Sequence, residues 1–547
     1  MLSRWNRLLV QKDGQISLLR LFAPLLLFRV LNALLIRTFF NPDEYWQSLE
    51  VAHHAVFGYG SLTWEWEEEL RGFLHPFLFA VPLQILRWFG CATPFLKILL
   101  PKLVQAAVAA LTDLYVFALA RLLHSQPQAL YALLCHLCLW FNSYCLVRTF
   151  SNSLESCLVV MALFFLWRAR LGMGGSRTGN VSLNDQRCGW ALAALSIAVR
   201  PTAALVWVAV GLHFVLTTQR PFRSLFCDVL PVGLAVTLVV SLLLDRLYYG
   251  RFTVVLWNFI RFNVVGSGGS FYGTHRWHWY LSNALPQILG PLLPLTIVGV
   301  YRSDHELSRL LILTVLWPTV VYSVFAHKEL RFLLPCVPVL MIACGSALHY
   351  VCVQWPRLRG HSEGQGSAVV RIRHHSVKQG RQKDRGPTSS RSTFHRAVLS
   401  LVVLQLVLNA PLALYFGVYH QRGVIDAIDW VRVHTDPALH SVFFFMPCHS
   451  TPLYSHVGRP IPMKFLECRP PLPGRIHYDE ADHFFDDPVA FIEHAPFTAT
   501  HLVMFEPTAQ TLAALLSARG YSEIVRFWHT WTPTDHRHGD VVIFVKE

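Results

Sequence analysis

Long apolar runs recur along most of the chain, and polar stretches separate them. Each run comes close to the roughly 20 apolar residues that an α-helix needs to cross a bilayer. We expect eleven membrane spans, near residues 18–40, 73–90, 98–121, 129–147, 153–168, 189–217, 226–247, 286–301, 308–326, 331–353 and 397–418. Arg200 and Pro201 interrupt the sixth run, where a pair of half-helices would change the count. The pattern predicts an α-helical polytopic membrane protein.

The charges around the first run set the expected orientation. Cations precede the run and no small-residue cleavage site follows it, so we expect an uncleaved span with a cytosolic N-terminus. Alternation of sides then puts residues 41–72, 248–285 and 419–547 outside the cytosol. Residues 168–188 also come out on that outer side, although they contain four Arg. The same stretch contains Asn180-Val181-Ser182, a glycosylation sequon that would need the outer side.

The last 130 or so residues have a different pattern, about as long as one small domain. "SVFFFM" and "THLVMF" are typical of buried strands, and "TAQTLAALLSARG" is typical of an amphipathic helix that ends at Gly. Strand-like "EIVRFW" and "DVVIFV" follow, so we expect a small α/β domain at 419–547. It contains no phosphate-binding glycine motif. Cys448 and Cys468 could form a disulfide if this domain is luminal.

Composition agrees with a membrane protein. The chain is 53% hydrophobic and 15% charged, with a mean hydropathy of +0.39, whereas soluble domains have about 25% charged residues. The net charge of +14 would suit nucleic acid, but residues 354–396 alone contain ten Lys and Arg against two acids. This Gly-, Ser- and Arg-rich stretch predicts a disordered cytosolic loop. An anionic-lipid or nuclear-localisation role for it is the alternative.

An acidic stretch follows the first span. Residues 41–70 contain seven carboxylates and no Lys or Arg. Asp43 and Glu44 come directly after Pro42, so we expect them in the opening turn of a short helix at the membrane surface. One interpretation is a solvated helix start that the helix dipole stabilises. The other is a carboxylate beside an apolar surface that acts as a base.

Cations at span ends are candidates for anion binding. "HKELRF" places His327, Lys328 and Arg331 beside Glu329 at an outer span end. These side chains either snorkel as an interfacial cap or contact a phosphate. Arg200 is another such cation. Arg148 is placed near the cytosolic end by the expected topology, which argues against a catalytic role for it.

Two further motifs combine His with aromatic or small polar residues. "THRWHWY" contains His275, Trp277 and His278, which suit stacking on a sugar or an isoprenoid, or anchoring at the interface. These are too few ligands for zinc, and we expect no metal. "MPCHSTPLYSH", residues 446–456, is expected to be a structural loop that faces the membrane site, with acceptor binding as the alternative.

Six segments together resemble the dolichyl-phosphate-mannose-dependent α-mannosyltransferases of the endoplasmic reticulum, and most closely their GPI mannosyltransferase III type. They occur in the family's order from the first loop to the C-terminal domain: "PDEYWQSLEVAHH", "SLTWEW", "RTFSNSLES", "FYGTHRWHWY", "HKELRFLLP" and "MPCHSTPLYSHV". The first family motif usually begins with His, where this chain has Asn41.

The resemblance implies the GT-C glycosyltransferase architecture in the endoplasmic reticulum membrane, with a luminal active site. Residues 1–353 would form the transmembrane glycosyltransferase region with luminal loops 41–72 and 248–285. Residues 354–396 would be the cytosolic loop, 397–418 the last span and 419–547 a luminal α/β domain. The donor would be dolichyl phosphate mannose, no cofactor would be needed, and no nucleic acid would bind.

The resemblance also implies the reaction, which is transfer of the third, α-1,2-linked mannose to a GPI precursor with two mannoses. Because a β-linked donor gives an α-linked product, the transfer inverts the anomeric centre and needs one base. By the family's motif, Asp43 is that base, and Glu44 orients the acceptor or supports Asp43. The residues expected to bind the substrates are His327, Lys328, Glu329, Arg331, His275, Trp277, His278 and Arg200.

Three alternatives stay open at this point. A mannosyltransferase of the N-glycan precursor would share the motifs but not the acceptor. A secondary transporter would have inverted repeats and broken helices at the midplane, whereas the charged motifs here gather at one side. An assembly subunit without catalysis would tolerate loss of Asp43.

Overall fold

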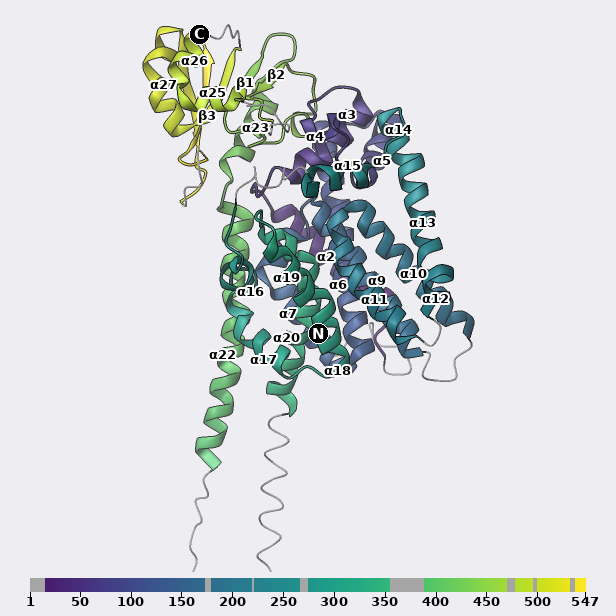
Figure 1. The fold of residues 1–547 in the computed structure, drawn as a ribbon. Helices are drawn as coiled ribbons and strands as arrows, with labels where there is room; N and C mark the ends of the chain where they lie inside the picture. The colour runs from purple at the N-terminus through teal and green to yellow at the C-terminus, as the bar shows by residue number, and fades with distance from the viewer. Residues whose placement is uncertain are drawn as a thin grey trace, which may run out of the picture.

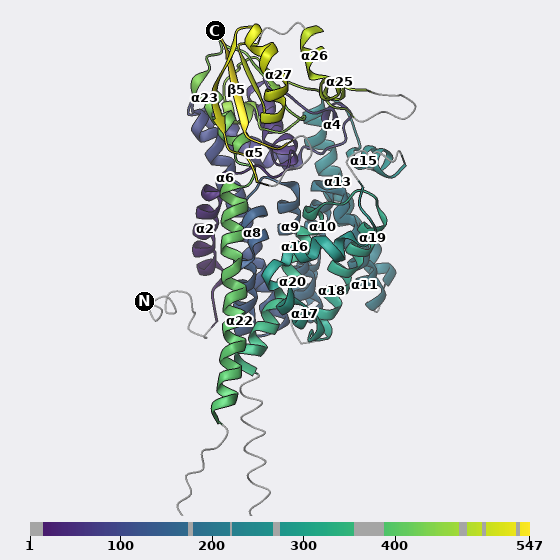
Figure 2. The ribbon, with the colours of Figure 1, turned by 90° about the vertical axis from the view of Figure 1, so that its left-hand side faces the viewer.

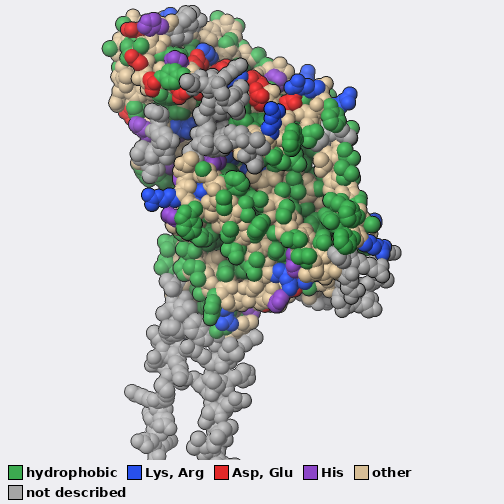
Figure 3. All heavy atoms as spheres, viewed as in Figure 1, with side chains coloured by type: hydrophobic (Ala, Val, Ile, Leu, Met, Phe, Trp, Pro, Cys, Tyr) green, Lys and Arg blue, Asp and Glu red, His purple; other side chains and the backbone are tan. Residues whose placement is uncertain are grey.

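The computed structural model describes residues 15–172, 179–218, 221–265, 274–354, 388–469, 478–494, 499–531 and 537–547. A bundle of long helices has a C-terminal α/β domain at one end (Figure 1). We call the end of the bundle that bears this domain the domain side and the other end the far side. On the face seen in Figure 3, charged side chains gather at these two ends and are scarce over the apolar middle. This is the distribution expected of a membrane-spanning bundle.

Seven helical runs within the described residues are long and apolar enough to cross a membrane: Leu18–Leu35, Pro94–Leu123, Ser224–Tyr249, Tyr280–Tyr301, His305–Val324, Leu330–Gln354 and Val402–His434. We call each crossing of the bundle from one end to the other a pass. Four shorter helical runs also lie within the bundle (Figures 1 and 2). The first is α7 (Gln126–Cys138) together with α8 (Trp140–Cys145), and the others are α9 (Ser151–Gly172), α10 (Gly179–Val199) and α11 (Ala204–Thr217). The described residues thus contain eleven passes, the number expected, but two of the expected spans are wrong.

Several passes consist of consecutive helical pieces. Their α-helical parts are α2 (Leu18–Leu35), α6 (Pro94–Leu123), α12 (Pro221–Arg223), α13 (Leu230–Val239), α14 (Arg246–Tyr249), α16 (Leu285–Leu289), α17 (Leu293–Tyr301), α18 (His305–Leu311), α19 (Trp317–Val324), α20 (Val337–His349) and α22 (Thr388–Leu414). Short π- or 3-10 segments join the pieces, among them η10 (Leu330–Cys336). Pro at the start of many pieces explains the breaks, because Pro removes a backbone donor from the preceding turn.

The expected span at 73–90 is not a span. Helix α5 (Leu74–Trp88) has only 15 residues and lies on the domain side beside α3 (Glu50–Phe57) and α4 (Trp64–Glu67) (Figure 1). One face of α5 is buried and the other exposes large apolar side chains such as Trp88, which is typical of a helix lying in the interface. The next helix, α6, also begins on the domain side, where Lys97 Nζ donates to the carbonyl oxygen of Gly458 in the C-terminal domain at 3.0 Å.

The expected single span at 189–217 is two passes. Arg200 and Pro201 end α10 and start a 3-10 turn, after which α11 returns to the far side. Two bonds establish these directions. Arg200 Nη1 donates to Ser151 Oγ at the start of α9 at 3.1 Å, whereas Arg170 Nη1 at the end of α9 donates to Thr217 Oγ1 at 3.1 Å.

These two corrections move the Arg-rich stretch 168–188 to the far side, opposite the C-terminal domain. The placement of that stretch with the domain is therefore wrong. The basic loop was expected at 354–396, but helix α22 already begins at Thr388, inside it. The passes that contain α20 and α22 both reach the far side (Figure 1), while residues 355–387 fall outside the described residues. The described ends of both Arg-rich segments thus lie on one side, as the positive-inside rule requires.

The C-terminal domain has a five-stranded mixed sheet of order β2-β1-β3-β5-β4. Its strands are β1 (Val442–Phe445), β2 (Met463–Phe465), β3 (His501–Phe505), β4 (Tyr521–Phe527) and β5 (Val541–Lys546), and its helices are α23 (Gly423–His434), α24 (Tyr454–Val457), α25 (Glu480–Asp486), α26 (Pro488–His494) and α27 (Glu506–Ala518). Strand β1 pairs in parallel with β2 and β3, and β5 is antiparallel to β3 and β4.

The two faces of the sheet have different partners. Phe443 and Phe445 pack with the helices α25, α26 and α27, whereas Val442 and Phe444 share a core with α23 and with Trp46 of the first loop. The predicted α/β domain is confirmed, and Cys448 and Cys468 form a disulfide in it. The second core joins the domain directly to the loop that contains Asp43 and Glu44.

Candidate active site

Asp43 lies in the opening turn of a short helix, as predicted. The amide of Trp46 donates to the carbonyl oxygen of Pro42 at 2.9 Å, and the turn continues into a π-helical segment at Tyr45–Leu49 and then α3. Asn41 caps the turn, because its Oδ1 accepts from the amide of Asp43 at 3.0 Å. The same Asn41 side chain donates to Glu329 Oε2 at 3.3 Å. Asn41 therefore links the first loop to the "HKELRF" segment.

Arg331 is the centre of an ion cluster that joins these two segments. Its Nη1 contacts Asp43 Oδ2 at 2.5 Å, although the two residues are 288 positions apart. Its Nε and Nη2 bind both oxygens of Glu329 at 2.5 and 2.8 Å, a bidentate geometry that suits a guanidinium. His327 Nε2 lies 3.0 Å from Glu329 Oε1.

The two carboxylates in the cluster keep some contact with solvent. The side chains of Asp43 and Glu329 are 20% and 22% exposed, whereas that of Arg331 is 6% exposed. Burial alone would raise the pKa of the Glu329 carboxyl, but Arg331 and His327 hold that pKa below its ordinary value. The cluster thus holds two partly exposed carboxylates, of which Glu329 is ionised, against a buried cation.

Glu44 points away from this cluster. Its Oε2 accepts from Arg148 Nη1 at 2.8 Å, and Arg148 also donates to the carbonyl oxygen and hydroxyl of Thr38 at 2.6 Å each. Burial raises the pKa of the Glu44 carboxyl, and the Arg148 guanidinium opposes that rise. Glu44 therefore ties the turn to the end of α2 and to the connection between α8 and α9.

The placement of Arg148 near the cytosolic end is wrong. Arg148 lies on the domain side beside Glu44, because the removal of the 73–90 span reverses the direction of the passes that follow it. The guanidinium is fully enclosed and also lies 4.3 Å from the centre of the Tyr144 ring.

Lys328 and Arg200 have partners of their own. Lys328 Nζ donates to the carbonyl oxygens of His275, at 3.1 Å, and Phe325. Burial lowers the pKa of its amino group. Arg200 Nε lies 3.1 Å from Glu155 Oε2, and the centre of the Arg200 guanidinium is 5.6 Å from the Phe332 ring centre.

Glu155 is an acid that the sequence analysis did not select. It lies inside "RTFSNSLES", within an apolar run, and a carboxylate in such a run is itself a signal of function. The Phe332 ring links this pair to the Asp43 cluster, because the guanidinium centres of Arg200 and Arg331 lie 5.6 and 5.9 Å from the ring centre.

The "THRWHWY" segment meets the site through its backbone. The amide of His275 donates to the carbonyl oxygen of Ala326 at 2.9 Å, and the His275 ring stacks on Trp279 with centres 4.6 Å apart. Trp277 is 71% exposed, and His278 Nδ1 is 2.9 Å from Ser282 Oγ. No bond from these three side chains to Asp43 or Arg331 is present among the described residues, and 266–273 fall outside them.

One group of possible metal ligands occurs among the described residues. Within the part of the chain that the structure describes, the one His, Cys, Asp and Glu group close enough to hold an ion is Cys448, His449 and Cys468. Its two sulfur atoms form the disulfide, so they are not thiolate ligands.

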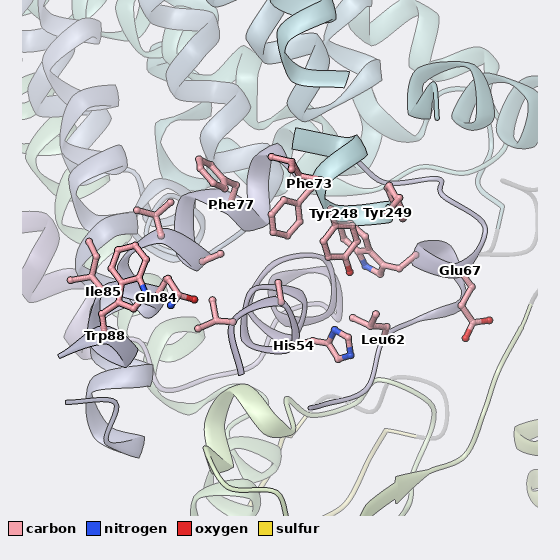
Figure 4. A pocket seen from close by; sticks show the side chains of 16 residues that line it. His54, Leu62, Glu67, Phe73, Phe77, Gln84, Ile85, Trp88, Tyr248 and Tyr249 are labelled. Atoms are coloured by element: carbon pink, nitrogen blue, oxygen red, sulfur yellow. The ribbon is translucent and has the colours of Figure 1, made fainter. Parts of the chain in front are cut away.

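An apolar cavity of about 820 Å³ lies between α3, α5 and α14 on the domain side (Figure 4). Phe73, Phe77, Tyr248 and Tyr249 line it, with His54 at its rim. Neither Asp43 nor Arg331 lines this cavity. It is therefore separate from the ion cluster.

The chain is similar to known proteins in sequence and in fold. The sequence model of the Alg9-like mannosyltransferase family matches residues 20–458. A relative from Mus musculus named GPI alpha-1,2-mannosyltransferase 3 is 38% identical over 514 residues, covering 92% of this chain and 85% of the relative. A relative from Yarrowia lipolytica named GPI mannosyltransferase 3 is 35% identical over 543 residues, covering 94% and 95%.

Two solved structures share the fold. ArnT from Cupriavidus metallidurans, crystallised with undecaprenyl phosphate, has a TM-score of 0.58 at 14% identity, with 95% of this chain and 96% of ArnT covered. The Archaeoglobus fulgidus oligosaccharyltransferase has a TM-score of 0.51 at 12% identity, with 95% and 75% covered. The predicted GT-C architecture is confirmed. Because the family match spans most of the chain and the relatives align along nearly all of it, the protein belongs to the Alg9-like mannosyltransferase family.

Proposed function

We propose that this protein transfers the third, α-1,2-linked mannose from dolichyl phosphate mannose to the GPI precursor with two mannoses. The names of the mouse and yeast relatives support this acceptor, since both are GPI mannosyltransferases of the third type. The observation that supports the chemistry most directly is the partly exposed Asp43 carboxylate against the buried Arg331.

The reaction is one inverting displacement. The acceptor hydroxyl oxygen bonds to the anomeric carbon of the donor on the face opposite the phosphate. The bond between that carbon and the phosphate oxygen breaks, and its electron pair leaves with dolichyl phosphate. Asp43 accepts the hydroxyl proton. Arg331 Nη1 donates to the Asp43 carboxylate and holds it in position for that proton transfer.

The remaining site residues have supporting roles in this proposal. Glu44 is a positioning residue, since it is enclosed by Arg148 and Thr38 and cannot contact an acceptor in this arrangement. Arg331, Lys328 and Arg200 are the candidate donors to the leaving phosphate, which departs as an anion and needs cations more than an acid. His275, Trp277 and His278 lie on the loop that Lys328 holds, at the rim of the site.

The proposed location is the endoplasmic reticulum membrane, with the N-terminus and the basic loop in the cytosol and the domain side in the lumen. Two features support this orientation. The described ends of the Arg-rich stretches lie on the far side, as those of cytosolic segments do. The Cys448–Cys468 disulfide lies on the domain side, and disulfides persist in the oxidising lumen.

The test uses membranes from cells that lack this enzyme, resupplied with the full-length chain, dolichyl phosphate [³H]mannose and the two-mannose GPI intermediate. Wild type is expected to form the three-mannose product. Asp43→Asn is expected to lower turnover by about 10²–10⁴-fold, the usual contribution of a general base. Glu68→Gln, which changes an exposed carboxylate of the same loop, is the control and is expected to keep wild-type turnover.

Two outcomes contradict the proposal at different points. Extension of the N-glycan precursor instead of the GPI intermediate by wild type would overturn the acceptor assignment. Full turnover by Asp43→Asn would overturn the role of Asp43 as the base.

A further inference from the structure

The C-terminal domain contributes a loop to the surroundings of the candidate base. We call residues 446–456 the domain loop. Trp46, three positions after Asp43, donates from its indole Nε1 to the carbonyl oxygen of Thr451 in this loop at 3.1 Å. The Trp46 ring centre is 4.6 Å from that of His449, and Trp46 is only 2% exposed. The turn that holds Asp43 thus rests against the domain loop through one buried tryptophan.

A buried carboxylate fastens the same contact one helical turn later. Glu50, which is fully buried, accepts from the amides of Leu453 and Ser455 at 2.8 and 3.2 Å and from the Ser455 hydroxyl at 2.6 Å. Charge-assisted bonds of this kind are the stronger class of hydrogen bond. The first loop and the domain loop therefore form one rigid unit.

The domain loop is itself held in place from several sides. The Cys448–Cys468 disulfide closes it, and Arg537 donates to Ser450 Oγ at 3.0 Å and to the carbonyl oxygen of Cys448 at 3.3 Å. His449 has a φ of +61°, in the left-handed region that few residues other than Gly adopt. Such a conformation persists only where its surroundings enforce it, and it often marks a functional site.

The His449 ring packs on Trp46 and on Phe465, with ring centres 4.6 and 5.3 Å apart. Burial and the nearby Arg537 lower the pKa of His449 to about 4, while the negative charge of Asp43 acts in the opposite direction. At neutral pH the ring is therefore uncharged, and it lies within the electrostatic reach of Asp43. A neutral ring can pack on an indole without neutralising the base.

We infer that His449 is a positioning residue for the transfer reaction. Its ring supports Trp46, and Trp46 fixes the turn from which Asp43 reaches the acceptor. The active site is thus composite, with the base on the first membrane loop and its support on the C-terminal domain. This inference rests on the proposed role of Asp43.

Two variants of the full-length protein separate the ring from the backbone. His449→Asn removes the ring but tolerates a left-handed φ, because Asn is enriched in that region. It is expected to lower kcat by about tenfold, with the KM for dolichyl phosphate mannose within about twofold of wild type, since loss of positioning costs rate more than donor binding. His449→Phe keeps an aromatic ring over Trp46 and is expected to restore kcat to within about threefold.

His434→Asn, at an exposed histidine of α23 in the same domain, is the control and is expected to behave as wild type. Equal turnover of His449→Asn and wild type would overturn the inference. So would a His449→Phe variant that melts at the wild-type temperature yet loses as much turnover as His449→Asn, because an aromatic ring at this position would then not support Trp46.

The same assay distinguishes failure of this inference from failure of the proposed function. If Asp43→Asn is inactive while His449→Asn is fully active, only the positioning role is overturned. If Asp43→Asn retains full turnover, the proposed base is wrong, and the inference falls with it.

Discussion

Two buried ion networks in this protein have similar chemistry but different access to water. Within the bundle, Arg29 of α2 binds both carboxylate oxygens of Asp113 of α6 at 2.7 Å each, and both side chains are fully buried. His136 of α7 lies 3.2 Å from the same carboxylate. On the domain side, Arg331 likewise binds a carboxylate with two nitrogens, but Asp43 and Glu329 stay about one-fifth exposed.

The difference shows what separates a structural charge pair from a reactive one. The Arg29–Asp113 pair joins three helices and is closed to solvent, so an acceptor hydroxyl has no route to it. In the Asp43 cluster the cation is buried and the carboxylates are partly exposed, so an acceptor hydroxyl can reach a carboxylate oxygen. Burial of an ion pair alone is therefore a poor guide to function. What distinguishes the reactive pair is that its carboxylate is accessible to a substrate.

The largest expected effect is on the closed network. Asp113→Asn leaves the Arg29 guanidinium without a counter-ion in the bundle and is expected to cost about 3–5 kcal/mol of stability. Thermal unfolding in detergent measures this loss, and turnover per folded molecule should stay near that of wild type. The double variant Arg29→Met, Asp113→Asn removes the stranded charge and should recover much of the stability. A wild-type melting temperature for Asp113→Asn alone would contradict the structural role of the Arg29–Asp113 pair.

A smaller effect is expected from changing the cation of the open cluster. Arg331→Lys keeps the charge but loses the fork that binds Asp43 and Glu329 together. Turnover is expected to fall about 10–100-fold, or about 1.4–3 kcal/mol of transition-state stabilisation, while the melting temperature moves little because both carboxylates can take water. Single-turnover assays with donor and acceptor check this. A large loss of stability with intact turnover would make the cluster structural, like its counterpart at Arg29.

Acidification is expected to loosen the domain loop. The folded protein lowers the pKa of His449 to about 4, through burial and Arg537, and of His456 to about 3, through burial and Lys102. Unfolded histidine titrates near 6.5, so this neutral-state stabilisation is complete above about pH 6.5 and declines as the pH falls towards 4. At pH 5 each histidine costs about 2 kcal/mol.

Hydrogen exchange of residues 446–456 at pH 7 and pH 5, corrected for intrinsic rates, measures this change. Protection should fall at pH 5 in the domain loop more than in helix α27, which packs on the other face of the sheet. Equal protection at both pH values in the domain loop would contradict the expectation.

The smallest effect is expected at Trp277, which belongs to neither network. Its side chain is 71% exposed, so Trp277→Ala is expected to change turnover by less than about threefold, as surface substitutions usually do. Steady-state kinetics with both substrates give the value. A loss of turnover above tenfold would indicate that this ring contacts a substrate, and the active site would then include the "THRWHWY" segment.

Much of the fold follows from the sequence pattern, and the failures have a common physical origin. Apolar length identified most of the spans and the strands of the C-terminal domain, because these elements must bury long apolar surfaces. Helix α5 failed because an interfacial helix and a spanning helix have similar composition and differ in length and in the apolar face. The run at 189–217 failed because Arg200 and Pro201 reverse the chain inside one apolar stretch.

The candidate site likewise contains residues that the sequence predicted and residues that it did not. Asp43, Glu44 and the "HKELRF" residues were selected from the sequence, and Asp43 and Arg331 meet in the structure. Arg148 was placed on the wrong side because the misassigned α5 inverts the span ends that follow it, up to the extra pass at 189–217, which restores the order. Glu155 was not selected. Residues 446–456 were expected to face the membrane site, but nothing in that segment singled out His449 as its contact with Trp46 of the first loop.

The sequence by itself determined that this is a multi-span membrane protein of a mannosyltransferase family, with an acid pair in the opening turn after Pro42. Those properties depend on composition, on local backbone preference and on motifs that are continuous in the chain. Only the tertiary structure decided that Asp43 binds Arg331 and stays partly exposed, and that Glu44 binds Arg148 and is buried. It also decided that the C-terminal domain supports the turn through Trp46. These contacts join residues 104 to 405 positions apart. Such contacts depend on how many times the chain crosses the membrane and on which helices pack together, and neither is encoded in any single segment.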